Sequence, residues 1–147
     1  MKKLLIIFLF AFQFVKAADN SGIFSPGIKL GYAFGEHGGF ICGVELSYVF
    51  GLANFVGSGP VLNIDYFNKT LKIHLNAEIV PFIGGFAAGP TLVLKESEWY
   101  WGYNFSLFLG LQFYLFYNYT NIYKYKFEET GFLFKAPIFI TGKISAG

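Results

Sequence analysis

Apolar residues alternate with small or polar residues along most of the chain. Between residues 28 and 34, and again between 40 and 50, the even positions are apolar, whereas the odd positions are mainly small or polar. A period of two is typical of β-strands that have one apolar and one small or polar face. The pattern therefore predicts strands, and it leaves open which face points inwards.

Segments of this kind recur every ten to fifteen residues, with turn residues between them. Charged turns at Gly35–Gly38, Asn68-Lys69, Lys95–Glu98 and Glu128–Gly131 alternate with uncharged turns. We expect an all-β, antiparallel up-and-down barrel that crosses a membrane and has chemically different ends. We place its eight strands at Pro26–Phe34, Gly39–Phe50, Val56–Phe67, Thr70–Val80, Phe86–Leu94, from Trp99 to a reversal between Gly110 and Tyr119, from there to about Phe127, and at Phe132–Thr141.

The turns suggest which residues face each other across neighbouring strands. If Phe34 faces Phe40, then Lys29 faces Glu45. The two-residue turn at Asn68-Lys69 sets the next pair of strands, with Asp65 opposite Lys72 and Asn63 opposite His74. Trp101 is likewise expected opposite Leu92.

The small and polar face cannot pack a dry core, but it can fill a narrow barrel in which opposite charges pair and glycines leave room. We interpret the charged residues there as structural pairs rather than as a proton or ion path. The predicted interior network is Lys29, Glu45, Asn63, Asp65, Lys72, His74 and Glu78.

The apolar face carries aromatic residues near both ends and aliphatic residues between them. Two aromatic bands around an aliphatic waist match the exterior of a barrel in a bilayer. The predicted aromatic girdle at the charged end is Tyr32, Phe34, Phe40, Tyr66, Trp99 and Trp101.

The first seventeen residues have the features of a cleaved secretory signal, with Lys2 and Lys3 before an apolar stretch. We expect residues 1–17 to be removed and residues 18–147 to form one domain. That domain would carry eight lysines against nine acids and no arginine, which gives no reason to expect a nucleic-acid partner. The chain is 22% aromatic but only 14% charged, below the ~25% charged residues of ordinary soluble domains, which indicates contact with lipid or a large apolar ligand.

Little in the sequence indicates catalytic chemistry. The single cysteine, Cys42, lies at an apolar position and is interpreted as a small hydrophobic residue. Neither a metal-ligand cluster nor a nucleophile elbow nor a phosphate-binding loop is present in the sequence. We therefore expect no catalytic residue, no cofactor and no metal site, and a protein that is not an enzyme.

With this pattern of strands, faces and aromatic bands, the chain resembles the small eight-stranded outer-membrane β-barrels of bacteria. The resemblance implies export to the outer membrane, contact with its lipid and assembly machinery, and a filled interior. It also implies a structural, surface-interaction or membrane-integrity role.

Two other interpretations stay open at this stage. A soluble periplasmic or secreted barrel could hold a lipid inside, with the two faces inverted. A helical inner-membrane protein could cross the membrane at residues 46–64 and 99–123, although the period of two argues against helices in these segments.

Overall fold

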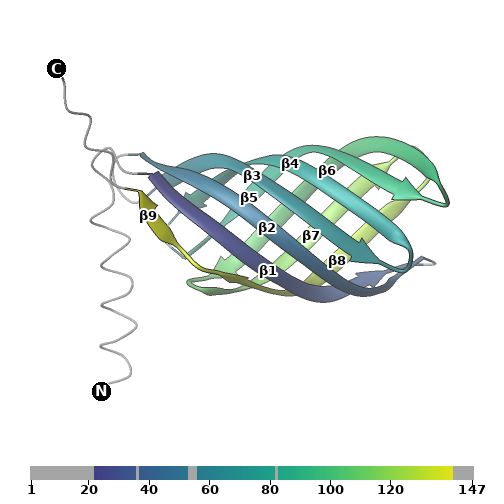
Figure 1. Cartoon of the computed structure of the whole chain (residues 1–147), viewed down its shortest axis with the longest axis horizontal. Coiled ribbons are helices and arrows are strands. Elements are labelled where there is room, and N and C mark those ends of the chain that lie inside the picture. Colours follow the sequence, from purple (N-terminus) through teal and green to yellow (C-terminus); the bar gives the residue numbers. More distant parts are fainter. Residues whose placement is uncertain (1–21, 36, 53–55, 82, 141–147) are drawn as a thin grey trace.

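Eight long antiparallel strands follow one another around a closed barrel (Figure 1). The computed structural model describes residues 22–35, 37–52, 56–81 and 83–140, so the expected signal segment lies outside the described residues. Each strand pairs with its neighbours in the chain, and β8 pairs with β1 to close the barrel. The strands are β1 (Gly22–Phe34), β2 (Gly39–Leu52), β3 (Val56–Phe67), β4 (Thr70–Pro81), β5 (Gly84–Lys95), β6 (Glu98–Gly110), β7 (Phe113–Ile122), β8 (Lys126–Lys135) and the short β9 (Ile138–Ile140).

The ninth strand continues the line of β8 along β1. β8 and β9 pair with β1 in one uninterrupted register, in which Lys135 faces Gly27 and Ile138 faces Phe24. Pro137 separates them because it lacks the backbone N–H that a continuous ladder would use. The backbone N–H of Ala136 still donates to the Pro26 carbonyl at 2.9 Å, so the closing seam extends past the proline.

The strands are strongly tilted. Following paired residues around the barrel from Gly22 returns to β1 at Tyr32, ten residues further along the same strand. Eight strands with this stagger are inclined by about 40° to the barrel axis. A barrel of eight strands has an interior just wide enough for side chains to fill, so the residues on its inner face must pack against one another.

Most of the predicted strand pairing is confirmed. Asp65 lies opposite Lys72, and Asn63 lies opposite His74. Leu92 lies opposite Trp101. Asn68 and Lys69 have positive φ values of 40° and 60°, as a tight two-residue hairpin of the favoured hand requires. The reversal after β6 lies at residues 111–112, inside the expected window.

The predicted register between β1 and β2 is wrong by two residues. Tyr32, not Phe34, lies opposite Phe40, so Lys29 faces Gly43 and Glu45 faces Gly27. The reason is a longer connection than expected, since the last pair between β1 and β2 is Ala33 with Gly39. A shift of two residues leaves every side chain on its predicted face, whereas a shift of one would have inverted them all.

The predicted end of the seventh strand and start of the eighth strand are also wrong. Residues 128–131, expected to form a turn, lie inside β8, and the chain instead reverses at Tyr123 and Lys124. Ile122 and Tyr125 flank this reversal and exchange both backbone hydrogen bonds, at 2.9 and 3.2 Å. In the segments considered as membrane helices, the described residues form strands and turns, and within the described residues no helix is long and apolar enough to cross a membrane.

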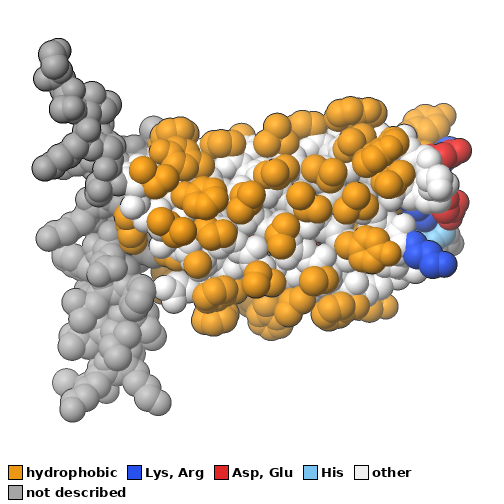
Figure 2. All heavy atoms as spheres, in the orientation of Figure 1, with side chains coloured by type: hydrophobic (Ala, Val, Ile, Leu, Met, Phe, Trp, Pro, Cys, Tyr) orange, Lys and Arg blue, Asp and Glu red, His pale blue; other side chains and the backbone are white. Residues whose placement is uncertain are grey.

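The two faces of the barrel differ sharply. Apolar side chains cover the side of the molecule, and on the face shown the charged side chains gather at one end (Figure 2). Large hydrophobic residues on the outside are exposed, such as Ile28 at 57% and Leu75 at 57%. The inner face holds most of the buried polar and charged side chains.

Candidate functional site

The barrel interior contains all seven residues predicted for the polar network. Each is buried, with at most 6% of its surface exposed. They come from β1, β2, β3 and β4, and each lies at an inward position of its strand because the side chains of a strand alternate between faces. The charged residues form two groups.

The first group, which we call the Asp65 cluster, consists of Lys29, Asp65, Lys72 and Glu129. Lys29 Nζ lies 2.9 Å from Asp65 Oδ2, and Lys72 Nζ lies 3.8 Å from the same oxygen. Lys72 also forms an ion pair with Glu129. The side chains of Asp65, Lys72 and Glu129 are fully buried, and two lysines balance two carboxylates.

Amide and hydroxyl groups complete the Asp65 cluster. Asn63 Oδ1 accepts a hydrogen bond from Lys29 at 3.2 Å, and Asn118 donates to Glu129 Oε2 at 3.1 Å. Thr120 accepts from Lys72 at 3.4 Å and donates to Asn104 at 2.9 Å. Such bonds are needed in this setting because a buried charge is tolerated only when it is paired and hydrogen-bonded.

The second group, which we call the Lys135 cluster, consists of Glu45, Glu78 and Lys135. Lys135 Nζ lies 2.5 Å from Glu45 Oε1 and 3.3 Å from Glu78 Oε2. One amine therefore serves two carboxylates. The side chains of Lys135 and Glu45 keep 8% of their surface exposed, while that of Glu78 keeps 1%.

A hydroxyl, an imidazole and a carboxylate lie in a row beside the Asp65 cluster. Thr91 Oγ1 is 2.8 Å from His74 Nδ1, and His74 Nε2 is 3.4 Å from Asp65 Oδ2. The order matches a nucleophile, base and orienting acid, but the Thr91 hydroxyl donates a hydrogen bond to the Ile73 carbonyl oxygen at 3.2 Å. Thr91 and His74 are each 1% exposed, so the row is enclosed within the barrel.

Two apolar clusters share the interior with the charges. One contains Ala33, Ile41, Phe67, Val93, Ile122 and Phe127, with Tyr100 and Tyr125 packed against it. These residues lie where the strands meet the charged turns, so they close that end of the barrel. The other contains Val61, Ala87, Phe108, Tyr114, Phe116 and Leu133, beside the Lys135 cluster. Lys135 Nζ lies 5.0 Å from the centre of the Phe108 ring, within the range of a cation–π contact.

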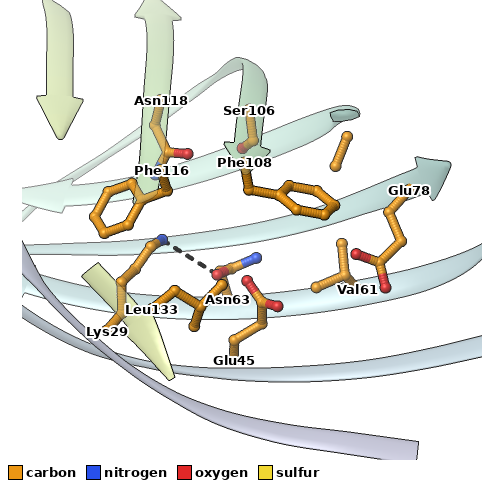
Figure 3. A pocket seen from close by; sticks show the side chains of 11 residues that line it. Lys29, Glu45, Val61, Asn63, Glu78, Ser106, Phe108, Phe116, Asn118 and Leu133 are labelled. Carbon is orange, nitrogen blue, oxygen red and sulfur yellow. Dashed lines mark hydrogen bonds between the residues drawn. The ribbon is translucent and has the colours of Figure 1, made fainter. Parts of the chain in front are cut away.

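A small cavity separates the two charge clusters. Lys29 lies at one side and Glu78 at the other, with Asn63 and Glu45 between them (Figure 3). Phe108 and other residues of the second apolar cluster form much of the remaining wall. The space in which the centre of a water molecule fits is about 10 Å³, which is enough for about one water.

Glycines on the inner face make room for the charged side chains, as the sequence predicted. A Cβ atom on Gly43 would lie 2.2 Å from Asp65 Oδ1 and 2.9 Å from the Ile64 carbonyl oxygen. A Cβ atom on Gly31 would lie 2.9 Å from the Phe116 ring. The interior around these two glycines therefore has no room for an added carbon atom.

The structure brings together some predicted residues and separates others. Lys29 and Asp65 form an ion pair, whereas the predicted pair of Lys29 and Glu45 is not formed, because the two-residue shift in register puts the cavity between them. Sequence reasoning missed Glu129 and Lys135, the partners of Lys72 and Glu45. Both lie on β8, where Phe127, Glu129, Leu133 and Lys135 occupy alternate inward positions, and that alternation was the available signal.

The six predicted girdle residues lie on the outer face. Their exposed fractions run from 50% to 71%. Cys42 is also exposed on the outer face and is a free cysteine. Among the described residues there is no group of three or more His, Cys, Asp and Glu side chains that could hold a metal ion.

The fold and the interior together define a class: a closed eight-stranded antiparallel β-barrel that is apolar outside and ion-paired inside. The chain matches no family model, no curated protein and no solved structure.

Proposed function

We propose that this protein is an outer-membrane β-barrel with a structural, surface-interaction or membrane-integrity role and without catalytic chemistry. The observation that carries the proposal is the inversion of the usual arrangement of side chains. Apolar residues such as Phe40, Leu75 and Trp101 are exposed around the outside, while the ion pairs of Asp65 and Lys135 are inside.

The apolar exterior needs lipid around it. Soluble monomers rarely expose a continuous apolar patch larger than a few hundred Å², and here apolar side chains cover the side of the barrel (Figure 2). In a bilayer the same side chains lie in their preferred surroundings. Closure of the sheet through β8 and β1 also pairs the backbone groups that lipid could not hydrogen-bond.

The dimensions of the barrel support the same proposal. β3 and β4 each contain 12 residues. At a tilt of about 40° and a rise of about 3.3 Å per residue, such a strand extends roughly 30 Å along the barrel axis. Known barrels of this kind present an apolar band of about 25 Å to the bilayer.

The interior favours a structural role over conduction or lipid carriage. A carrier needs an apolar cavity large enough for its ligand, whereas the described cavity has room for about one water and is lined by Lys29, Glu45 and Glu78. An open pore needs a continuous path, whereas the apolar cluster around Phe67 and Phe127 lies across the charged end.

Fractionation of cells and heat-modifiable gel mobility test this proposal. We expect the protein in the outer-membrane fraction, and a gel mobility that changes on boiling. A soluble protein that co-purifies with lipid would contradict the proposal and support the carrier instead.

The single cysteine offers a sharper measurement. Cys42 on the lipid-facing side should resist a membrane-impermeant maleimide in intact membranes and react after denaturation. The matched control moves the cysteine to the charged end, in a Cys42→Ser, Lys69→Cys variant, where it should react in intact membranes without denaturation. Rapid labelling of Cys42 in intact membranes would exclude a lipid-facing position.

A further inference from the structure

We propose that the cavity beside the Lys135 cluster is a binding site for one small monovalent cation of the size of sodium, held by Glu78 and Glu45. The proposal does not rest on the membrane assignment, because it depends only on the charges and space inside the barrel.

The first step is the balance of charge. The Asp65 cluster has two lysines and two carboxylates, which are joined in one chain of ion pairs. The Lys135 cluster has one lysine for two carboxylates, so it carries one negative charge in excess. An uncompensated charge inside a protein is strongly unfavourable, so a positive species is needed there.

The second step is the geometry of Glu78. Its Oε2 atom contacts Lys135, but its Oε1 atom has no hydrogen-bond partner among the described residues, although the residue is 1% exposed. Figure 3 shows the carboxylate turned towards the cavity, with that of Glu45 also directed into it. A buried carboxylate oxygen without a partner at the wall of a cavity calls for a water molecule or an ion beside it.

The third step is the fit of the ligand. The room for about one water also suits a small alkali cation. Oxygen atoms at the wall come from Glu45, Glu78, Ser106 and the amides of Asn63 and Asn118, and alkali cations bind oxygen. Because Lys135 already neutralises one carboxylate, a monovalent cation balances the charge and a divalent cation would exceed it.

The fourth step is access. The side chains of Glu45 and Lys135 keep 8% of their surface exposed, so a species the size of water can touch them. The Asp65 cluster differs, because Asp65, Lys72 and Glu129 have no exposed side-chain surface. A cation that reaches the interior is therefore expected at Glu78 and Glu45.

The test compares salts of equal ionic strength. The complete folded protein in detergent is heated in lithium, sodium, potassium or choline chloride, and the midpoint of the gel-mobility change is recorded. We expect sodium to raise the midpoint relative to choline by roughly 4 °C, the size expected when the cation is at about ten times its Kd. Choline is the reference because it is too large for the cavity.

Variants locate the effect. Glu78→Gln removes the excess charge, so its midpoint should be the same in sodium and in choline. Glu128→Gln makes the same change in charge at an exposed position of β8, and it should keep the sodium effect. If Glu78→Gln does not fold, Glu45→Gln takes its place. The four-salt series on the unaltered protein still tests whether a small cation stabilises the barrel.

Three results would overturn the proposal. The first is an unaltered protein with equal midpoints in all four salts. The second is a midpoint that rises at lower pH regardless of the cation and loses this rise in Glu78→Gln, which would assign the charge to a proton. The third is loss of the sodium effect in Glu128→Gln, which would place the cation on the surface.

Discussion

The two charge clusters inside the barrel are both built from lysines and carboxylates, but only one of them has all of its charges paired. The Asp65 cluster pairs two lysines with two carboxylates, surrounds them with amides and hydroxyls, and is fully buried. The Lys135 cluster leaves one carboxylate oxygen of Glu78 without a hydrogen bond and lies beside a cavity. The difference suggests that the first cluster holds the barrel together and that the second has room for a ligand.

This contrast follows from position. The Asp65 cluster lies next to the apolar layer that closes the charged end, where neighbouring side chains leave no free space around Asp65. The Lys135 cluster depends on Lys135, the last residue of β8 before the interruption at Ala136 and Pro137. Four predictions test the contrast.

The largest effect is expected from Asp65→Asn. The change removes the carboxylate between Lys29 and Lys72 and leaves two buried lysines with Glu129 alone. We expect the free energy of unfolding to fall by about 3–5 kcal/mol, measured by urea titration of the folded protein in detergent. Glu128→Gln, on the exposed side of β8, should change it by less than about 0.5 kcal/mol. A loss below about 1 kcal/mol in Asp65→Asn would contradict the structural role of this cluster.

A double-mutant cycle compares the pairing inside each cluster. Lys72→Met and Glu129→Gln should be coupled by about 1–3 kcal/mol, because the two side chains form an ion pair without exposed surface. Lys135→Met and Glu78→Gln should be coupled less, because Lys135 keeps Glu45 when Glu78 is neutralised. The cycle uses the same urea titration, and an equal or larger coupling in the Lys135 cluster would remove the distinction between the two.

Glycine substitutions compare the free space near each cluster. In Gly43→Ala the new methyl group meets Asp65 Oδ1 at 2.2 Å, and overpacking of this kind costs about 1–3 kcal/mol. Gly27→Ala, beside Lys135, meets its nearest neighbours, Leu133 Cδ1 and the Phe134 carbonyl oxygen, at 3.0 Å and should cost less. Unfolding free energies of the two variants check the order, and the reverse order would show that the interior near Lys135 is the tighter one.

The smallest effect is expected from Glu78→Gln in a sodium-free buffer. Neutralising this residue removes the excess negative charge, so the loss of its contact with Lys135 is offset. The free energy of unfolding should change by less than about 1 kcal/mol in either direction. A loss as large as that of Asp65→Asn would mean that Glu78 is a structural partner like Asp65.

The sequence predicted the inner and outer faces better than it predicted the contacts. Alternation places Lys72, His74 and Glu78 on one face of β4 whatever strand lies beside it. The pairing of β3 with β4 was also predictable, because the two-residue turn at Asn68 and Lys69 leaves little freedom in register. The loop after Phe34 has no such constraint, so the predicted partner of Lys29 was wrong.

Partners on β8 could not be found in the same way. The residues Glu128–Gly131 have the composition of a turn, and the true reversal at Tyr123 and Lys124 lacks glycine and asparagine. The misplaced strand concealed Glu129 and Lys135 from the predicted network. Local turn preference conflicted here with the pairing of β8 to both β7 and β1, and the tertiary pairing prevailed.

By itself the sequence determined most of the strands and the two faces of this protein, because a period of two is a local property of the chain. Only the tertiary structure decided that the sheet closes with a ten-residue stagger, and that Lys29 meets Asp65 while Lys135 meets Glu45 and Glu78. These contacts join strands that are distant in sequence, such as β1 with β3 and β8 with β4. They depend on the register and closure of the whole barrel, which no single segment specifies.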